Sequence, residues 1–68
     1  MITTHLPELR RAAGFESQAA FAGEIGCHWR TIQDLERGIS LPSLPTMQRI
    51  CRVLGKTPEA IWPEGESQ

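Results

Sequence analysis

The sequence predicts an all-α fold of five short helices in one compact domain. Apolar residues recur at helical spacing in five segments, and a glycine or a proline follows each of them. No segment alternates apolar and polar residues in the way that a half-buried strand does. Hydrophobic residues make up 40% of the 68 residues, which is enough for a small folded core. We therefore expect one domain over residues 1–63, followed by a frayed acidic tail over residues 64–68.

The first three predicted helices are short and closely connected. The first covers residues 5–13, with Pro7 in its first turn. The second begins after Ser17, a favourable N-cap residue, and ends at Gly26, where the left-handed conformation is accessible. A third helix follows almost at once, over residues 28–37. Two short helices joined by a tight glycine turn are the most informative local feature.

The fourth predicted helix has the strongest amphipathic stripe. It covers residues 44–54, with Ser43 as its N-cap and Gly55 after its last turn. A fifth helix of about one turn follows Thr57 over residues 58–62. Five helices with short connections are therefore the simplest architecture for a chain of this length.

The stretch from Phe21 to Gly38, FAGEIGCHWRTIQDLERG, resembles the helix-turn-helix of the lambda-repressor/Cro-like (XRE) family. The resemblance continues without gaps through the later helices and covers residues 6–62. It implies a lambda-repressor-like domain whose second and third helices form the helix-turn-helix, with the third helix in the major groove of DNA. It also implies an inward-facing structural ion pair between Arg10 and Glu36.

Four residues of the third predicted helix are candidates for contact with DNA bases. They lie opposite the expected core residues of this helix, and they are Trp29, Arg30, Gln33 and Asp34. The guanidinium of Arg30 matches the O6 and N7 acceptors of guanine, and Gln33 can pair with adenine. Asp34 accepts from cytosine N4, or it pairs with Arg30 or Arg37 on the helix surface.

Trp29 has three interpretations. Its indole can press on thymine methyl groups, pack back on Phe15 or Phe21 as added core, or contact a protein. Members of the family more often have a small or polar residue at this position. The tryptophan is therefore a feature that the resemblance does not account for.

A second group of residues is expected to contact DNA phosphates. The group comprises Gln18, His28, Thr31, Arg37, Ser40 and Ser43. Gln18 matches a family glutamine that binds a phosphate, and His28 can cap the third helix and, when protonated, approach a phosphate. The family usually has Lys or Arg just after the glycine that ends this helix, whereas Ile39 and Leu41 stand there in this chain.

The modest basic charge indicates that tight DNA binding needs two domains. The net charge is −1, although residues 5–56 hold seven basic and five acidic residues, a local balance of +2. Because neutralisation of phosphates supplies most of the sequence-independent affinity, we expect a homodimer at least on DNA. The predicted dimer surface is apolar and C-terminal, with Leu54, Ile61 and Trp62. In the alternative, Trp62 only closes the core of the monomer.

Other classes of protein fit the sequence less well. It shows no nucleophile with a base, no metal cluster and no phosphate-binding loop, so neither an enzyme, a cofactor nor a bound metal is expected. Cys27 and His28 are adjacent but lack a second pair of ligands at zinc spacing. Without an apolar run long enough to cross a bilayer or a leader pattern, we expect a cytoplasmic protein with reduced cysteines.

The resulting hypothesis is a sequence-specific transcriptional regulator. We expect a repressor that binds a palindromic operator as a dimer, with double-stranded DNA as its partner. The alternative is a protein-binding helix-turn-helix module of the antitoxin or antirepressor type. Exposed apolar residues such as Ile39 and Leu41 and the low basic charge favour that alternative.

Overall fold

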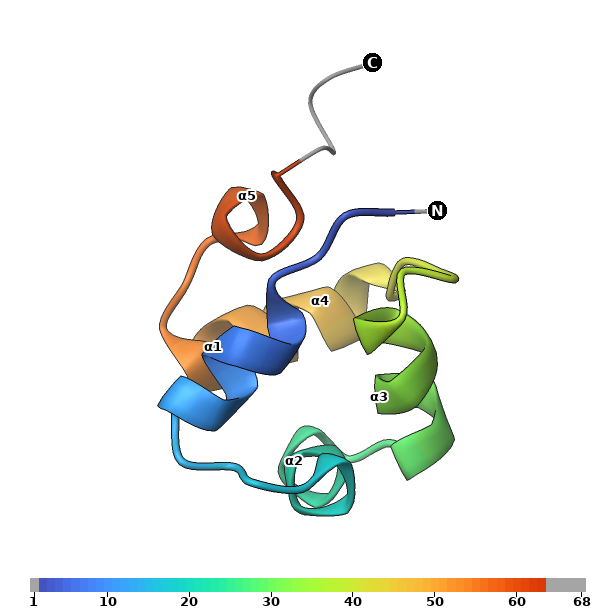
Figure 1. Ribbon diagram of the computed structural model, residues 1–68, viewed down its shortest axis with the longest axis vertical. Coiled ribbons are helices and arrows are strands. Elements are labelled where there is room, and N and C mark those ends of the chain that lie inside the picture. The colour runs from blue at the N-terminus through green and yellow to red at the C-terminus, as the bar shows by residue number, and fades with distance from the viewer. Residues whose placement is uncertain (1, 64–68) are drawn as a thin grey trace.

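The computed structural model describes residues 2–63 and arranges them as five helices around one core (Figure 1). These helices are α1 (Leu6–Ala12), α2 (Gln18–Ile25), α3 (Trp29–Glu36), α4 (Leu44–Leu54) and α5 (Pro58–Ile61). The predicted all-α fold is confirmed, and the predicted bounds differ by at most one residue at either end of a helix. The differences arise because the outermost residues serve as caps rather than as helical residues. The expected tail over residues 64–68 lies outside the described residues.

Side-chain caps begin three of the helices. Ser17 Oγ accepts from the amide of Ala20 at 3.0 Å, and Thr57 Oγ1 accepts from the amide of Ala60 at 3.2 Å. His28 caps α3 in the same way, through Nδ1. The expected cap at Ser43 is wrong in one respect, because its hydroxyl donates to the hydroxyl of Thr46 at 3.1 Å and to no backbone amide. Since α4 has a proline at its second position, one amide that an N-cap would satisfy is missing.

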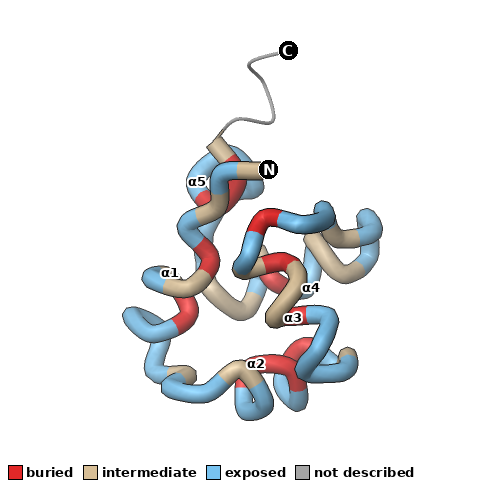
Figure 2. The backbone as a smooth tube through the Cα atoms, turned by 45° about the vertical axis from the view of Figure 1, so that its right-hand side comes forward, coloured by how far each residue is buried: buried red, intermediate tan, exposed pale blue. Residues whose placement is uncertain are grey.

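Every helix contributes to the core. Figure 2 shows the buried positions on the sides of the helices that face one another. The buried apolar residues are Leu6, Phe21, Ala22, Ile25, Ile32, Leu35, Ile50, Ile61 and Trp62. A core of this size leaves little excess stability, because a chain of fewer than about 70–80 residues rarely gains more than about 3–5 kcal/mol from one core.

The predicted dimer surface requires a correction. Ile61 is fully buried and only 4% of Trp62 is exposed, and both belong to the core of the monomer. Leu54 is half-buried and packs against the same core. Ile61 and Trp62 therefore close the core of the monomer, because α5 is a single turn of four residues and a helix this short is stable only when it packs against others.

The segment before α1 ties the end of α3 to α5. The amide of Ile2 donates to the carbonyl of Gly38 at 2.9 Å, and the amide of His5 donates to the carbonyl of Ile61 at 2.8 Å. Gly38 has φ of +75°, and a Cβ at this position would collide with the carbonyl oxygen of Ile2. Glycine is therefore required at position 38 for two reasons, which are its left-handed backbone conformation and the close approach of the N-terminal segment.

Candidate nucleic-acid interface

The turn between α2 and α3 sets the orientation of α3. Gly26 has φ of +90°, and its amide and that of Cys27 both donate to the carbonyl of Ala22, at 2.8 and 3.0 Å. Arg49 of α4 reaches across and donates through Nη1 to the carbonyl of Ile25 at 2.8 Å. This bond places a cation at the C-terminal end of α2, where the helix dipole favours one, and fastens the turn to α4. Nothing in the spacing of the sequence indicated the contact of Arg49.

α3 has one face in the core and one face in solvent. Ile32 and Leu35 are buried and hold the inner face against the other helices. On the outer face, most of the predicted contact residues are exposed and two are half-buried. The exposed residues are Trp29, Arg30, Thr31 and Arg37, and the half-buried ones are Gln33 and Asp34.

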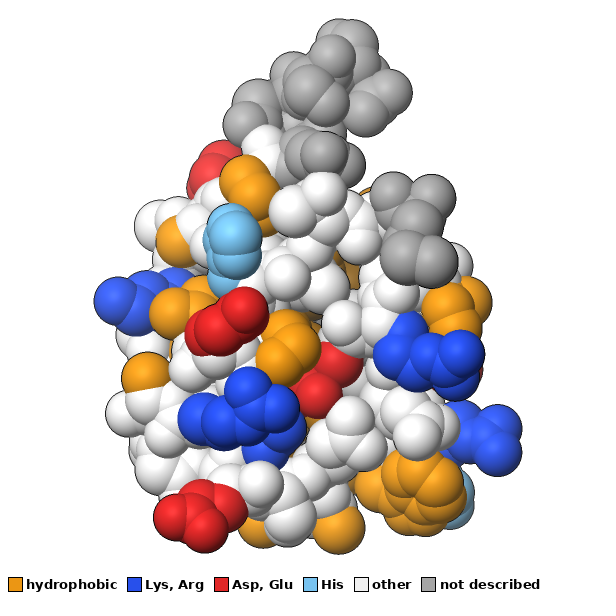
Figure 3. Space-filling view, viewed as in Figure 1, with side chains coloured by type: hydrophobic (Ala, Val, Ile, Leu, Met, Phe, Trp, Pro, Cys, Tyr) orange, Lys and Arg blue, Asp and Glu red, His pale blue; other side chains and the backbone are white. Residues whose placement is uncertain are grey.

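Three consecutive side chains form a stacked cluster at the start of α3. His28 Nδ1 accepts from the amide of Arg30 at 3.1 Å, which fixes the imidazole as the helix cap. The Trp29 indole lies beside that imidazole, with ring centroids 5.7 Å apart and planes 32° apart. The guanidinium carbon of Arg30 lies 5.6 Å from the centroid of the Trp29 ring, within range for a cation–π interaction. Figure 3 shows hydrophobic, histidine and basic side chains gathered over this end of α3.

The position of Trp29 excludes one of its three interpretations. Trp29 is 43% exposed, so it is not added core. Phe15 and Phe21 instead pack against each other, edge to face, with ring centroids 5.3 Å apart. The interpretation in which Trp29 folds back on these rings is therefore wrong, because the two phenylalanines pack against each other and the indole stays exposed.

The opposite end of α3 is held by a buried polar network. Arg10 Nε donates to Glu36 Oε2 at 2.6 Å, so the ion pair implied by the family resemblance is present, and both side chains are almost wholly buried. Arg10 Nη1 donates to the carbonyl of Phe15 at 2.7 Å, which holds the connection between α1 and α2. The second carboxylate oxygen of Glu36 accepts from Gln18 Nε2 at 2.9 Å. Sequence reasoning missed this last bond, which links the first residue of α2 to the last residue of α3.

Asp34 does not take part in a surface ion pair in the structure. Within residues 2–63, Arg10 and Glu36 form the only salt bridge. The expectation that Asp34 pairs with Arg30 or Arg37 is therefore not met. The guanidinium of Arg30 instead lies over the indole of Trp29.

The connection between α3 and α4 carries the remaining predicted phosphate contacts. Arg37, Ser40 and Ser43 are all exposed. Large apolar side chains alternate with them, since Ile39 is 56% exposed and Leu41 is 52% exposed. A surface of this composition has hydroxyl groups but few cations, so its electrostatic attraction for a phosphate is weaker than that of a lysine-rich loop.

The sequence profile of a helix-turn-helix family matches residues 8–61. The chain belongs to the XRE, or lambda-repressor-like, helix-turn-helix family. This family consists of DNA-binding regulatory domains, and the match spans all five helices almost from end to end. No curated protein and no solved structure matches the chain at a significant level.

The two cysteines of this helix-turn-helix domain are free thiols. Burial raises the pKa of the Cys27 thiol above its ordinary value. Burial raises the pKa of Cys51 as well, and the nearby carboxylate of Glu59 adds to that rise. Both thiols are therefore protonated near neutral pH, a form that is a poor nucleophile and a poor metal ligand. Residues 2–63 contain no group of three or more His, Cys, Asp or Glu side chains that could hold a metal ion.

Among the same residues, every helix is too short or too polar to span a membrane.

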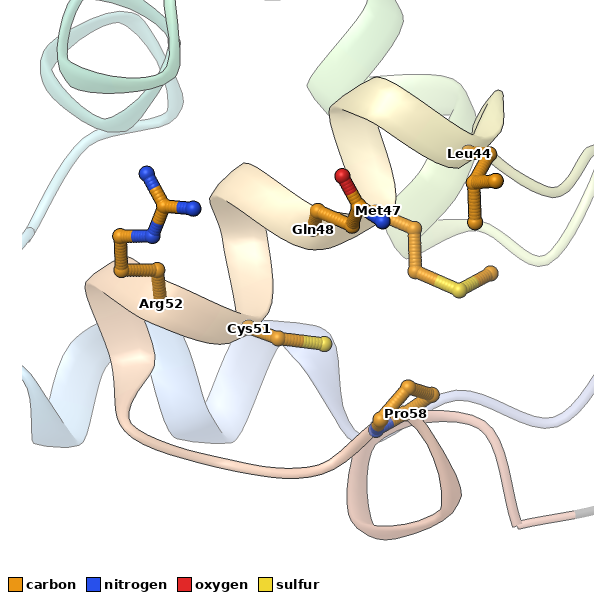
Figure 4. Close-up of a pocket in the computed structure, with 6 residues that line it drawn as sticks. All are labelled: Leu44, Met47, Gln48, Cys51, Arg52 and Pro58. Atoms are coloured by element: carbon orange, nitrogen blue, oxygen red, sulfur yellow. The ribbon is translucent and has the colours of Figure 1, made fainter.

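A shallow groove lies along α4 of the helix-turn-helix domain, and no residue of α3 lines it (Figure 4). It has a volume of about 510 Å³ and is lined by Leu44, Met47, Gln48, Cys51, Arg52 and Pro58. Leu44 at its rim is 65% exposed, the largest exposure among the bulky apolar residues described. The groove is mostly apolar with one cation, which suits contact with another protein surface better than contact with a phosphate.

Proposed function

We propose that this helix-turn-helix domain is a sequence-specific transcriptional regulator that lays α3 in the major groove of DNA. The exposure of the N-terminal end of α3 carries the proposal. Trp29 and Arg30 project from this end, and the guanidinium meets an aromatic face rather than a carboxylate. No salt bridge engages its five N–H donors within residues 2–63, so they can form the bidentate pair with guanine O6 and N7. Gln33 and Asp34, one turn later, are assigned to the neighbouring base pairs.

The predicted phosphate contacts fit around this helix as hydrogen-bond donors. Because His28 Nδ1 accepts the cap bond, the neutral ring carries its proton on Nε2 and can donate to a phosphate without becoming charged. Gln18 uses one hydrogen of its amide on Glu36 and has a second one to offer. The remaining donors of this set are Thr31, Arg37 and Ser40, all of them exposed. The exposed hydroxyl of Ser43 joins them by exchanging its bond to Thr46 for a phosphate oxygen.

The low basic charge supports a dimer on a palindromic operator. The chain has a net charge of −1, so one domain neutralises few phosphates. Two copies on half-sites one helical turn apart combine their affinities, and a dimer that covers a promoter in the cytoplasm acts as a repressor. Because Ile61 and Trp62 are buried, contact between the copies is left to side chains that the monomer exposes.

Selection of duplexes from a random library tests the proposal directly. The purified protein is used at two salt concentrations, beside an Arg30→Ala/Gln33→Ala variant of α3. The matched control is Arg52→Ala/Gln48→Ala on α4, which removes the same two residue types from exposed positions of another helix. We expect a palindromic motif with the native protein and the control, and its loss with the α3 variant.

The outcomes separate the parts of the proposal. Absence of any enriched motif at low salt contradicts sequence-specific reading. A motif that survives in the α3 variant contradicts the assignment of α3 as the reading element. A motif without two-fold symmetry contradicts the dimer on a palindrome and leaves the reading helix intact.

A second candidate function is a protein-binding module, and the exposed apolar residues after α3 favour it. Ile39, Leu41 and Leu44 are each more than half exposed, and Leu44 borders the groove on α4. Exposed apolar patches of this kind are typical of protein interfaces. An Ile39→Ser/Leu41→Ser/Leu44→Ser variant distinguishes the two functions, because a DNA-reading domain keeps its base preference when these side chains change.

A further inference from the structure

The stacked cluster of His28, Trp29 and Arg30 is more than three exposed residues in a row. The cap bond from His28 to the amide of Arg30 fixes the imidazole on the helix end. The indole of Trp29 lies against that imidazole, and the guanidinium of Arg30 lies over the indole. The backbone of α3 thus orients the imidazole, the imidazole orients the indole, and the indole restricts the flexible side chain of Arg30.

We infer that Trp29 is a specificity-determining residue, which positions Arg30 and reads a methyl group beside the guanine that Arg30 reads. The preferred step is then guanine next to a pyrimidine with a 5-methyl group, either thymine or 5-methylcytosine. This inference rests on the proposed function, because it assumes that α3 lies in the major groove.

The contact with Trp29 constrains the side chain of Arg30. A free arginine side chain loses much rotational freedom when it forms a bidentate pair with a base. The guanidinium carbon lies over the indole ring, 5.6 Å from its centroid, and this contact restricts the positions that the side chain can occupy. The pair with guanine therefore forms from an arginine that is already partly ordered.

The exposed part of the Trp29 indole can itself contact a base. A group stacked beside a guanidinium that is paired with one base lies next to the edge of the neighbouring base pair, because base pairs are stacked along the groove. The only apolar group on the major-groove edge of a base is the 5-methyl of thymine, and a 5-methylcytosine presents the same group. The indole carbons of Trp29 are apolar and 43% of the side chain is exposed, so this methyl is the group it fits.

The experiment removes and adds single methyl groups in the selected duplex. Each thymine is replaced by deoxyuridine, and each cytosine by 5-methylcytosine, one position at a time. With the native protein, we expect deoxyuridine beside the guanine assigned to Arg30 to weaken binding about fourfold, the equivalent of about one buried methylene. Where that position holds cytosine, 5-methylcytosine is expected to strengthen binding by a similar factor.

Variants of Trp29 test the coupling. Trp29→Ala should bind the methylated and unmethylated duplexes alike, and it should lower the preference for guanine over other bases about two- to fivefold through Arg30. Trp29→Phe should retain part of both effects. Leu44→Ala, which removes an exposed apolar side chain from α4, is the matched control and should change neither.

The results distinguish failure of this inference from failure of the proposed function. A selected motif whose guanine depends on Arg30 but whose affinity ignores every methyl group overturns the inference and leaves the proposed function standing. Equal loss of affinity for all duplexes with Trp29→Ala also overturns it, because a merely structural role predicts that result. No motif at all contradicts both.

Discussion

The two ends of α3 use an arginine in opposite ways. At the N-terminal end, Arg30 is exposed and lies over the indole of Trp29. At the C-terminal end, the guanidinium of Arg10 is buried against the carboxylate of Glu36, at 2.6 Å. An exposed cation–π contact contributes about 0.5–1 kcal/mol, whereas removal of one partner from a buried ion pair costs about 3–5 kcal/mol. The same chemical group therefore stabilises the fold at one end and remains available to a ligand at the other.

In this small domain, the side chains that are exposed to a ligand are therefore separate from the polar network that stabilises the fold. Substitutions in the cluster of His28, Trp29 and Arg30 should have little effect on folding, because these side chains are exposed and water can replace their mutual contacts. The buried network cannot, because each of its polar groups has a protein partner that would be left unsatisfied. Gln18 connects the two roles, since it binds Glu36 and is also proposed to bind a phosphate.

The largest expected effect is that of Glu36→Ala. This change leaves the guanidinium of Arg10 buried without its carboxylate, which should lower the free energy of unfolding by about 3–5 kcal/mol. Because the whole domain is expected to have about that much stability, the variant should be largely unfolded at 25 °C. Circular dichroism at 222 nm, with thermal melting, measures the loss of helix.

Two further variants control this experiment. Glu24→Ala removes an exposed carboxylate from α2 and should leave the melting temperature nearly unchanged. Arg10→Met/Glu36→Leu removes both charges together, and it should recover much of the lost stability. A double variant as unstable as Glu36→Ala would show that packing, and not the unpaired charge, determines the effect.

Gln18→Ala should have an intermediate effect on folding. The change removes a hydrogen bond to a charged acceptor, and such bonds contribute about 1.5–3 kcal/mol when buried, so a half-buried one should contribute toward the lower end. Gln18→Glu should lower stability further, because a carboxylate would then face the carboxylate of Glu36. Urea unfolding of both variants, beside Gln48→Ala on α4, tests this order, and equal midpoints for all three would contradict it.

Opposite effects are expected from the same substitution at two glycines of the helix-turn-helix. Gly26→Ala forces a Cβ into a backbone with φ of +90°, and this should cost about 1–2 kcal/mol. Its Cβ would also lie 2.8 Å from Arg49 Nη1, although that long side chain can move. Gly23→Ala lies inside α2 with no atom near its Cβ and should stabilise the domain by about 0.5–1 kcal/mol. Thermal melting of the pair checks the sign. An unchanged melting temperature for Gly26→Ala would contradict the assignment of Gly26 as the left-handed turn residue, and a loss for Gly23→Ala would contradict the open surroundings of Gly23.

The smallest effect on folding is expected at the exposed end of α3. Trp29→Ala/Arg30→Ala should change the free energy of unfolding by no more than about 1 kcal/mol, while it abolishes the base preference proposed above. Ile32→Ala, a buried residue of the same helix, should lower stability by about 2–5 kcal/mol. A large loss of stability in the double variant would show that the cluster is structural and would remove the contrast between the two ends of α3.

Much of the fold could be predicted from local patterns. Helical periodicity and the glycines at 14, 26, 38 and 55 placed all five helices, because a helix end depends on the conformations its neighbouring residues allow. The cap at His28 was also predictable, since it needs only an acceptor two residues before the amide. The long-range contacts of Arg49 and Gln18 were not, because residues 24 and 18 positions apart meet only after the helices pack.

Local patterns in the sequence were enough to predict the helices, the family and the residues of α3 that face away from the core. The packing of the helices then determined what those residues contact. It turned Ile61 and Trp62 inward rather than toward a second copy, and it left Asp34 without an ion pair in residues 2–63. It also placed the Arg30 guanidinium on Trp29. Periodicity fixes the direction of a side chain from its own helix, whereas its partner depends on the distances between elements, which no local pattern contains.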